Sequence, residues 1–126
     1  MNLRCIIVDD EPNAVNLLEV LVGQSTSWQL LTKCYNALDA ISFLKDNAVD
    51  LIFLDINMPG LDGYEVCRQL KSSGTKSPHI IMISGTKDPM AETMAKKYGA
   101  DGFCHKQAGA ILETLMRYYQ IERKLK

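Results

Sequence analysis

The sequence predicts an α/β domain whose parallel sheet is covered by helices on both faces. Short apolar runs typical of buried strands alternate five times with segments whose apolar residues recur at helical spacing. The run 51–55 is apolar up to its last residue instead of alternating, as in strands buried on both faces. No linker or low-complexity stretch interrupts the pattern, so we expect one domain over residues 1–126.

The first unit sets the pattern for the others. A strand over residues 4–8 is expected to stop at an acidic loop, and a helix over residues 13–22 follows. Pro12 lies near the first turn of this helix, where a missing N–H costs little, and Gly23 follows as a plausible stop.

The later elements are predicted from the same signals. The second strand is expected over residues 29–34, and Asn36 or Asp39 is expected to cap the helix after it. The remaining strands are expected over residues 51–55, 79–83 and 101–105, and the remaining helices over residues 64–70, 88–98 and 108–124.

Composition excludes several classes of function. A formal net charge of −1 gives no basic surface for nucleic acid. No apolar run approaches the roughly 18 residues of a membrane span, and no signal-peptide core is visible, so a cytoplasmic protein is expected. The four cysteines are far apart in the sequence and form no C-x-x-C pair, which predicts reduced thiols: Cys5, Cys34, Cys67 and Cys104.

Polar residues follow four of the predicted strands. Asp9 and Asp10 come after the first strand, and Asp55 ends the third. Ser84 follows the fourth strand and Lys106 the fifth. Because ligand sites of such sheets lie outside the carboxyl ends of the strands, we expect these side chains to share one site.

Three carboxylates in one partly desolvated pocket repel one another, and such a cluster would either take up a proton or recruit a cation. Hard oxygen ligands favour Mg²⁺. With the metal bound, Asp55 would be a nucleophile towards phosphorus and would form an acyl phosphate. Phosphoryl transfer needs mainly positioning and neutralised charge, which Mg²⁺, Lys106 and the Ser84 hydroxyl would supply.

The polar segments also resemble a known family. The sequence is similar to the receiver domain of response regulators in two-component signalling, over nearly its whole length. The motifs that carry the resemblance are Asp9-Asp10-Glu11-Pro12, Asp55-Ile56-Asn57-Met58-Pro59-Gly60-Leu61-Asp62-Gly63, Ser84-Gly85, Gly99-Ala100-Asp101-Gly102-Phe103 and Lys106. The resemblance implies a flavodoxin-like fold with five parallel strands in the order 2-1-3-4-5.

The resemblance also implies a phosphorylation reaction. A histidine kinase or phosphotransfer protein would donate a phosphoryl group to Asp55. Asp10, Asp55 and the backbone carbonyl of Asn57 would bind Mg²⁺, with Asp9 acting through water, and Lys106 would contact the phosphate. Such a domain catalyses only its own phosphorylation and dephosphorylation and is not a turnover enzyme.

Further roles implied by the resemblance concern switching. Ser84 would move towards the phosphate and Phe103 would swing inwards, while Asn57 and Thr86 would tune dephosphorylation. The surface formed by the fourth helix, fifth strand and fifth helix would contact an output partner or a second copy. In a longer parent chain, the helix from about residue 108 would lead into an output domain.

One position departs from the family pattern. Gln107 stands where the family usually has a proline after the lysine, often in a cis peptide. A non-proline cis bond costs about 3 kcal/mol, so a trans bond is expected here. The departure puts switching in question more than phosphorylation.

Each site residue also has a simpler interpretation. Asp9 and Asp10 alone would suit a solvated helix start, and Ser84 alone would suit a turn cap. Lys106 would otherwise be a surface lysine, and Phe103 a plain core residue.

Three other functions compete with that of a phosphoacceptor. A flavin carrier needs N–H donors after the first strand, where Asp9-Asp10-Glu11 would repel the phosphate. A phosphatase with an aspartate nucleophile usually has a second Asp at the position of Asn57. A receiver-like scaffold that accepts no phosphoryl group remains open because of Gln107.

Overall fold

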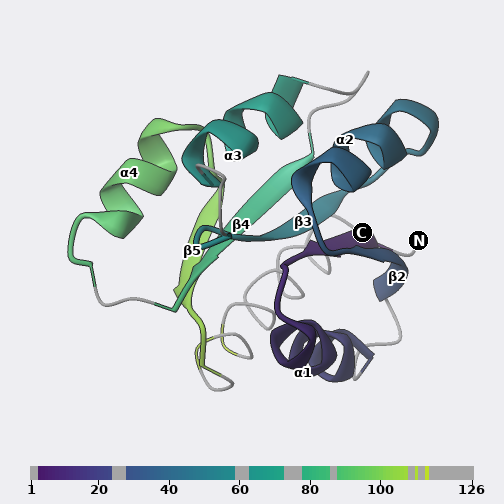
Figure 1. Ribbon diagram of the computed structural model, residues 1–126, viewed down its shortest axis with the longest axis horizontal. Helices are drawn as coiled ribbons and strands as arrows, with labels where there is room; N and C mark the ends of the chain where they lie inside the picture. The colour runs from purple at the N-terminus through teal and green to yellow at the C-terminus, as the bar shows by residue number, and fades with distance from the viewer. Residues whose placement is uncertain are drawn as a thin grey trace, which may run out of the picture.

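The computed structural model describes residues 3–23, 28–58, 63–72, 78–85 and 88–107, together with Ala110 and Glu113. Five parallel strands form one sheet in the order β2-β1-β3-β4-β5, as the family resemblance implied (Figure 1). The strands are β1 (Leu3–Val8), β2 (Trp28–Cys34), β3 (Leu51–Asp55), β4 (His79–Ser84) and β5 (Gly102–His105). The helices are α1 (Pro12–Gly23), α2 (Ala37–Asp46), α3 (Gly63–Ser72) and α4 (Ala91–Lys97).

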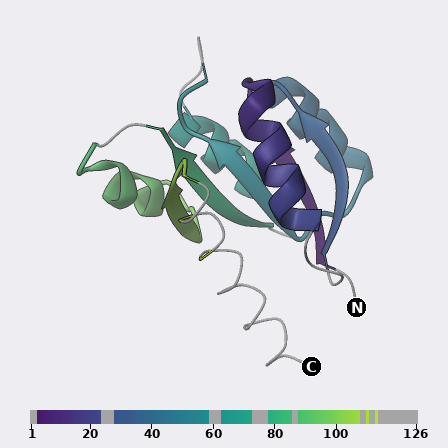
Figure 2. The same ribbon diagram turned by 90° about the horizontal axis from the view of Figure 1, so that it is seen from below.

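Helices lie on both faces of the sheet. Helix α1 lies on one face, and α2, α3 and α4 lie on the other (Figures 1 and 2). Successive residues of a strand point to opposite faces. Ile6 therefore packs in the core under α2 and α3, whereas Ile7 packs in the core under α1. The predicted doubly wound architecture is confirmed.

Strand β3 lies in the middle of the sheet and is buried along its whole length. Val8 of β1 pairs with Leu54 of β3, and Asp55 pairs with Ile83 of β4. This register brings the carboxyl ends of β1, β3 and β4 to the same edge of the sheet.

The structure confirms two local predictions, one at the start of α2 and one at the end of α4. The Asn36 side chain accepts a hydrogen bond from the Asp39 N–H at 2.9 Å and caps α2, so the first of the two expected caps is the correct one. Gly99, with φ of 102°, ends α4 as predicted, since a residue without Cβ adopts this conformation without strain.

The predicted start of α4 at Asp88 is wrong. The helix begins three residues later, at Ala91. The Asp88 carboxylate accepts the Met90 N–H at 2.9 Å and its carbonyl accepts the Ala91 N–H at 3.1 Å. These two bonds hold residues 88–91 in a turn, which replaces the expected first helical turn.

Gly63 fixes the start of α3 against the end of β3. A Cβ atom at this position would lie 2.6 Å from both Cα and the carbonyl oxygen of Ile56, which is closer than atoms can approach. Only glycine allows this contact. Ile56, the residue after Asp55, therefore lies directly against the first residue of α3.

Several predictions lie outside the described residues. These include the loop at residues 59–62, Thr86, and the helix expected over residues 108–124 except for Ala110 and Glu113. Ala110 packs against the core under α1. All four cysteines are buried, and none of them lies in a disulfide. Among the helices that the structure describes, none is long and apolar enough to span a bilayer.

Candidate acidic site at the carboxyl edge of the sheet

The structure brings three carboxylates together where β1 and β3 end. Asp9 and Asp10 follow β1, and Asp55 is the last residue of β3. Each offers an oxygen, and these oxygens all lie within 4.8 Å of one another. Asp9 and Asp55 are only 1% and 2% exposed, so their charges are largely removed from water, whereas Asp10 is exposed.

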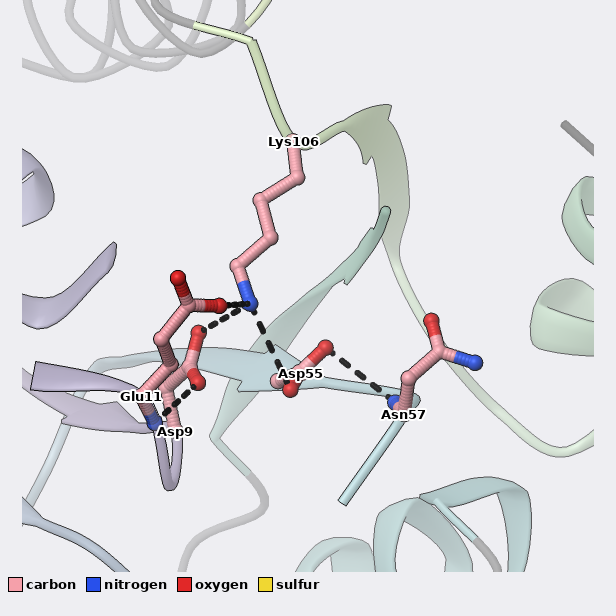
Figure 3. A network of polar contacts seen from close by, with 5 residues as sticks. All are labelled: Asp9, Glu11, Asp55, Asn57 and Lys106. Atoms are coloured by element: carbon pink, nitrogen blue, oxygen red, sulfur yellow. Dashed lines mark hydrogen bonds and ion pairs between the residues drawn. The ribbon is translucent and has the colours of Figure 1, made fainter. Parts of the chain in front are cut away.

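Local backbone hydrogen bonds fix the two buried carboxylates. Asp9 Oδ1 accepts the Glu11 N–H at 2.9 Å, and Asp55 Oδ1 accepts the Asn57 N–H at 3.1 Å. Each carboxylate therefore uses one oxygen within its own loop and presents the other, Oδ2, to the site (Figure 3).

Lys106 reaches this site from the end of β5. Its Nζ lies 3.0 Å from Asp9 Oδ2 and 3.6 Å from Asp55 Oδ2 (Figure 3). Its backbone N–H donates to the Ser84 carbonyl at 2.7 Å, which ties the residue to β4. Lys106 is only 17% exposed, so it is not the ordinary surface lysine of the simpler interpretation.

The electrostatics of the site reflect a shortage of positive charge. Burial raises the pKa of Asp55 above its usual value; the Asn57 N–H opposes this rise, and the Asp9 charge adds to it. Burial alone would lower the pKa of Lys106, but its contacts with Asp9 and Asp55 outweigh burial and raise that pKa. Lys106 is thus held as a cation among carboxylates that it only partly neutralises.

Asp9 Oδ2 shows this shortage most clearly. The atom is buried and, among the described residues, accepts no hydrogen bond, although the Lys106 ammonium is an ion contact at 3.0 Å. This buried oxygen therefore depends on an ammonium that it shares with Asp55 and Glu11. Three converging carboxylates that share one lysine fit a hard divalent cation such as Mg²⁺.

The site opens into a pocket of about 450 Å³. It is lined by Asp10, Glu11, Pro12, Asp55, Asn57, Gly85 and Lys106. A second pocket of about 600 Å³ shares Gly85 and Lys106 with the first and is also lined by Ser84 and Phe103. The predicted switch residues therefore lie beside the acidic pocket instead of inside it.

Phe103 is half-buried, which suits neither a fully buried core residue nor a free surface residue. It packs against the core under α2 and α3 and meets the His105 ring edge to face, with ring centroids 5.4 Å apart.

The Lys106–Gln107 peptide bond is trans, as expected, since the described residues include no cis bond. The Gln107 N–H donates to the His105 carbonyl at 2.8 Å.

Sequence reasoning missed one residue of the site. The Glu11 carboxylate lies 3.3 Å from Lys106 Nζ. The run Asp9-Asp10-Glu11 was itself the available signal, because a third acidic residue in the same loop faces the same strand edge. Its pairing with a lysine 95 residues away could not be inferred from spacing.

The fold and the site together define a doubly wound α/β domain with an acidic pocket at the carboxyl edge of its sheet. Residues 5–116 match the family described as the response regulator receiver domain. The chain belongs to this family and is a receiver domain of the two-component response regulator class.

Individual relatives agree with this assignment. The chain is 32% identical over 102 residues to the Fimbriae Z protein of Salmonella typhimurium, covering 81% of this chain and 48% of that protein. It is 31% identical over 126 residues to the alkaline phosphatase synthesis transcriptional regulatory protein PhoP of Bacillus subtilis, covering 96% of this chain and 51% of that protein. The chain thus spans about half the length of these curated relatives.

A solved structure gives the same result. The response regulatory domain of protein mrkE from Klebsiella pneumoniae superposes with a TM-score of 0.82 at 29% identity. The match covers 97% of this chain and 99% of that domain. The sheet and its helices therefore belong to one known fold.

Proposed function

We propose that this receiver domain is a phosphoacceptor, in which Asp55 receives a phosphoryl group from a histidine kinase or a phosphotransfer protein. The observation that carries the proposal is the placement of Asp55. Its carboxylate is 2% exposed at the end of β3, with one oxygen held by the Asn57 N–H and the other facing Lys106. A fixed carboxylate beside a cation and an open pocket is suited to attack on phosphorus.

Asp10, Asp55 and the backbone carbonyl of Asn57 would hold Mg²⁺, with Asp9 acting through water. Three of these residues contribute to the cluster of converging carboxylates, and Asn57 lines the same pocket. When bound, the metal supplies positive charge that offsets the repulsion among the carboxylates and the charge on the phosphoryl oxygens.

In the transfer itself, a carboxylate oxygen of Asp55 forms a bond to phosphorus. The bond from phosphorus to the donor's leaving group breaks, and the leaving group keeps the electron pair. The product is an acyl phosphate. The Lys106 ammonium would then contact the new phosphoryl group, because it already lies 3.6 Å from Asp55 Oδ2.

Ser84 and Phe103 would pass the change to the surface. Both line the pocket that adjoins the acidic site, so a movement of Ser84 towards the phosphoryl group would change the space available to Phe103. Helix α4, β5 and the helix expected from about residue 108 would present the altered surface to an output partner or a second copy.

The remaining roles concern the lifetime of the acyl phosphate and the extent of the domain. Asn57 lines the acidic pocket, and we assign it, together with Thr86, to tuning the hydrolysis of the acyl phosphate. The domain would catalyse its own phosphorylation and dephosphorylation without acting as a turnover enzyme. We place all 126 residues in a single receiver domain whose final helix leads into an output domain when the parent chain is longer.

Intact-mass analysis after incubation with acetyl phosphate tests the proposal. A gain of one phosphoryl group is expected with Mg²⁺ and not in its absence. Asp55→Asn should lose the gain, and Asp46→Asn should keep it, because Asp46 is an exposed carboxylate at the end of α2. No gain in the wild-type protein under any condition would favour the scaffold function instead.

A further inference from the structure

Glu11 contacts the Lys106 ammonium from the opposite side of the pocket to Asp55 (Figure 3). Its Oε2 lies 3.3 Å from Nζ, in a contact between residues 95 positions apart. The Glu11 backbone is fixed on both sides, because its N–H donates to Asp9 Oδ1 and its carbonyl accepts the Val15 N–H of α1. The side chain therefore begins from a rigid position at the rim of the pocket.

Three carboxylates thus compete for one ammonium. Asp9 and Asp55 also belong to the cluster that can hold a cation, but the Glu11 carboxylate lies outside that cluster. A cation bound to the cluster would neutralise Asp9 and Asp55 and weaken their hold on Lys106. Glu11 would then remain as the anionic partner of the lysine.

We propose that Glu11 is a positioning residue that holds the Lys106 ammonium on the β1 side of the pocket and restrains its movement to the phosphoryl group of Asp55. The part of this inference that concerns phosphorylation rests on the proposed function. Glu11 is 58% exposed, so solvent screens its charge and its hold on the lysine is modest. It acts through Lys106 and need not touch the phosphoryl group itself.

The first test uses the metal-free protein and needs no phosphorylation. An amine-reactive reagent is applied under limiting conditions, and the modification of each lysine is measured by peptide mass spectrometry. Glu11→Gln should raise the labelling rate of Lys106 by about threefold, as expected for the loss of one partly exposed ion pair. An unchanged rate would overturn the inference.

Glu19→Gln is the matched control. Glu19 lies on α1, is exposed and pairs with Lys33 at 3.2 Å, so this variant also removes one carboxylate from one ion pair. It should raise labelling at Lys33 and leave Lys106 unchanged. An equal rise at Lys106 in the control would show a general effect of net charge and would also count against the inference.

The second test measures phosphorylation by acetyl phosphate at saturating Mg²⁺. Glu11→Gln should speed phosphorylation about threefold, because a restraint of ion-pair size on Lys106 has been removed. In a Lys106→Met background the same substitution should have no effect. An effect that persists there would show that Glu11 acts on the metal or the donor and not through Lys106.

The two tests separate the inference from the proposed function. If no variant is phosphorylated, the proposed function fails, while the labelling of metal-free protein still decides whether Glu11 holds Lys106.

Discussion

Both ends of the sheet carry acidic residues, two at the amino end and four at the carboxyl end, but the two ends use them differently. At the amino end, Asp50 precedes β3 and Asp101 precedes β5. Asp50 accepts the Arg4 backbone N–H at 2.9 Å and the Arg4 guanidinium at 3.1 and 3.2 Å. Asp101 accepts the Ile80 N–H at 2.9 Å and the Lys71 ammonium at 2.6 Å.

At the carboxyl end, Lys106 forms ion pairs with three carboxylates of the described residues, those of Asp9, Glu11 and Asp55. Asp10 adds a further carboxylate to the same cluster. The comparison shows that acidic residues at a sheet edge mark a binding site only when their charge is left uncompensated. At the amino end the acidic residues stabilise the fold through paired contacts, whereas at the carboxyl end the cluster of carboxylates could hold a cation.

The largest effect is expected at the amino end. Asp50→Ala leaves the Arg4 backbone N–H without its carboxylate partner, and should lower the free energy of unfolding by about 3 kcal/mol. The Arg4 guanidinium adds little to this loss, because it is 42% exposed and water replaces its partner. Urea denaturation should give the same loss with and without Mg²⁺. A loss that Mg²⁺ reversed would contradict the structural role assigned to this end.

Lys106→Met should have the next largest effect. The substitution leaves the buried Asp9 Oδ2 without its ion contact, and should lower the free energy of unfolding of the metal-free protein by about 2 kcal/mol. Mg²⁺ should recover most of the loss, because it supplies the missing charge. Equal losses in both conditions would mean that the two ends do not differ as described.

Asp55→Asn should stabilise the metal-free protein at pH 7 by about 1 kcal/mol, the size of a typical single-site effect. Burial and the Asp9 charge raise the pKa of Asp55, so ionisation of this group opposes folding. The cost is absent below the unfolded pKa of roughly 3.9 and grows as pH rises through the folded pKa. Urea denaturation from pH 3 to 7 measures the difference in free energy of unfolding between the variant and the wild type. This difference should increase with pH, and a constant difference would disprove its electrostatic origin.

The smallest effect is expected at an exposed ion pair outside both acidic groups. Glu19→Gln removes the exposed pair with Lys33 and should change the free energy of unfolding by only about 0.3 kcal/mol. High salt should remove even this difference, since exposed charges are screened. A change larger than that of Lys106→Met would show that burial does not govern these pairs.

The sequence was sufficient to predict the buried central strand and the three aspartates that the structure brings together. The apolar run ending in Asp55 predicts a central buried strand, and β3 spans the same five residues. The parallel order then places Asp9, Asp10 and Asp55 together, because each follows or ends a strand at the same edge.

Other features depend on contacts that no sequence pattern encodes. The start of α4 was misplaced because the Asp88 carboxylate satisfies a turn N–H that a helix would otherwise use. The second pocket, which Ser84 and Phe103 line, depends on how side chains pack at the end of β5. The Glu11–Lys106 contact depends on the path of a long side chain across the site.

The most direct test of the account is thermal unfolding of the wild-type protein during a Mg²⁺ titration. A cation bound at tenfold above its dissociation constant stabilises the fold by about 1.4 kcal/mol, or roughly 5 °C for a domain of this size. We predict this rise for the wild type and for Asp50→Asn, and a much smaller one for Asp55→Asn. A melting temperature that does not change with Mg²⁺, or that rises equally in Asp55→Asn, would contradict the claim that the carboxyl end of the sheet is short of positive charge.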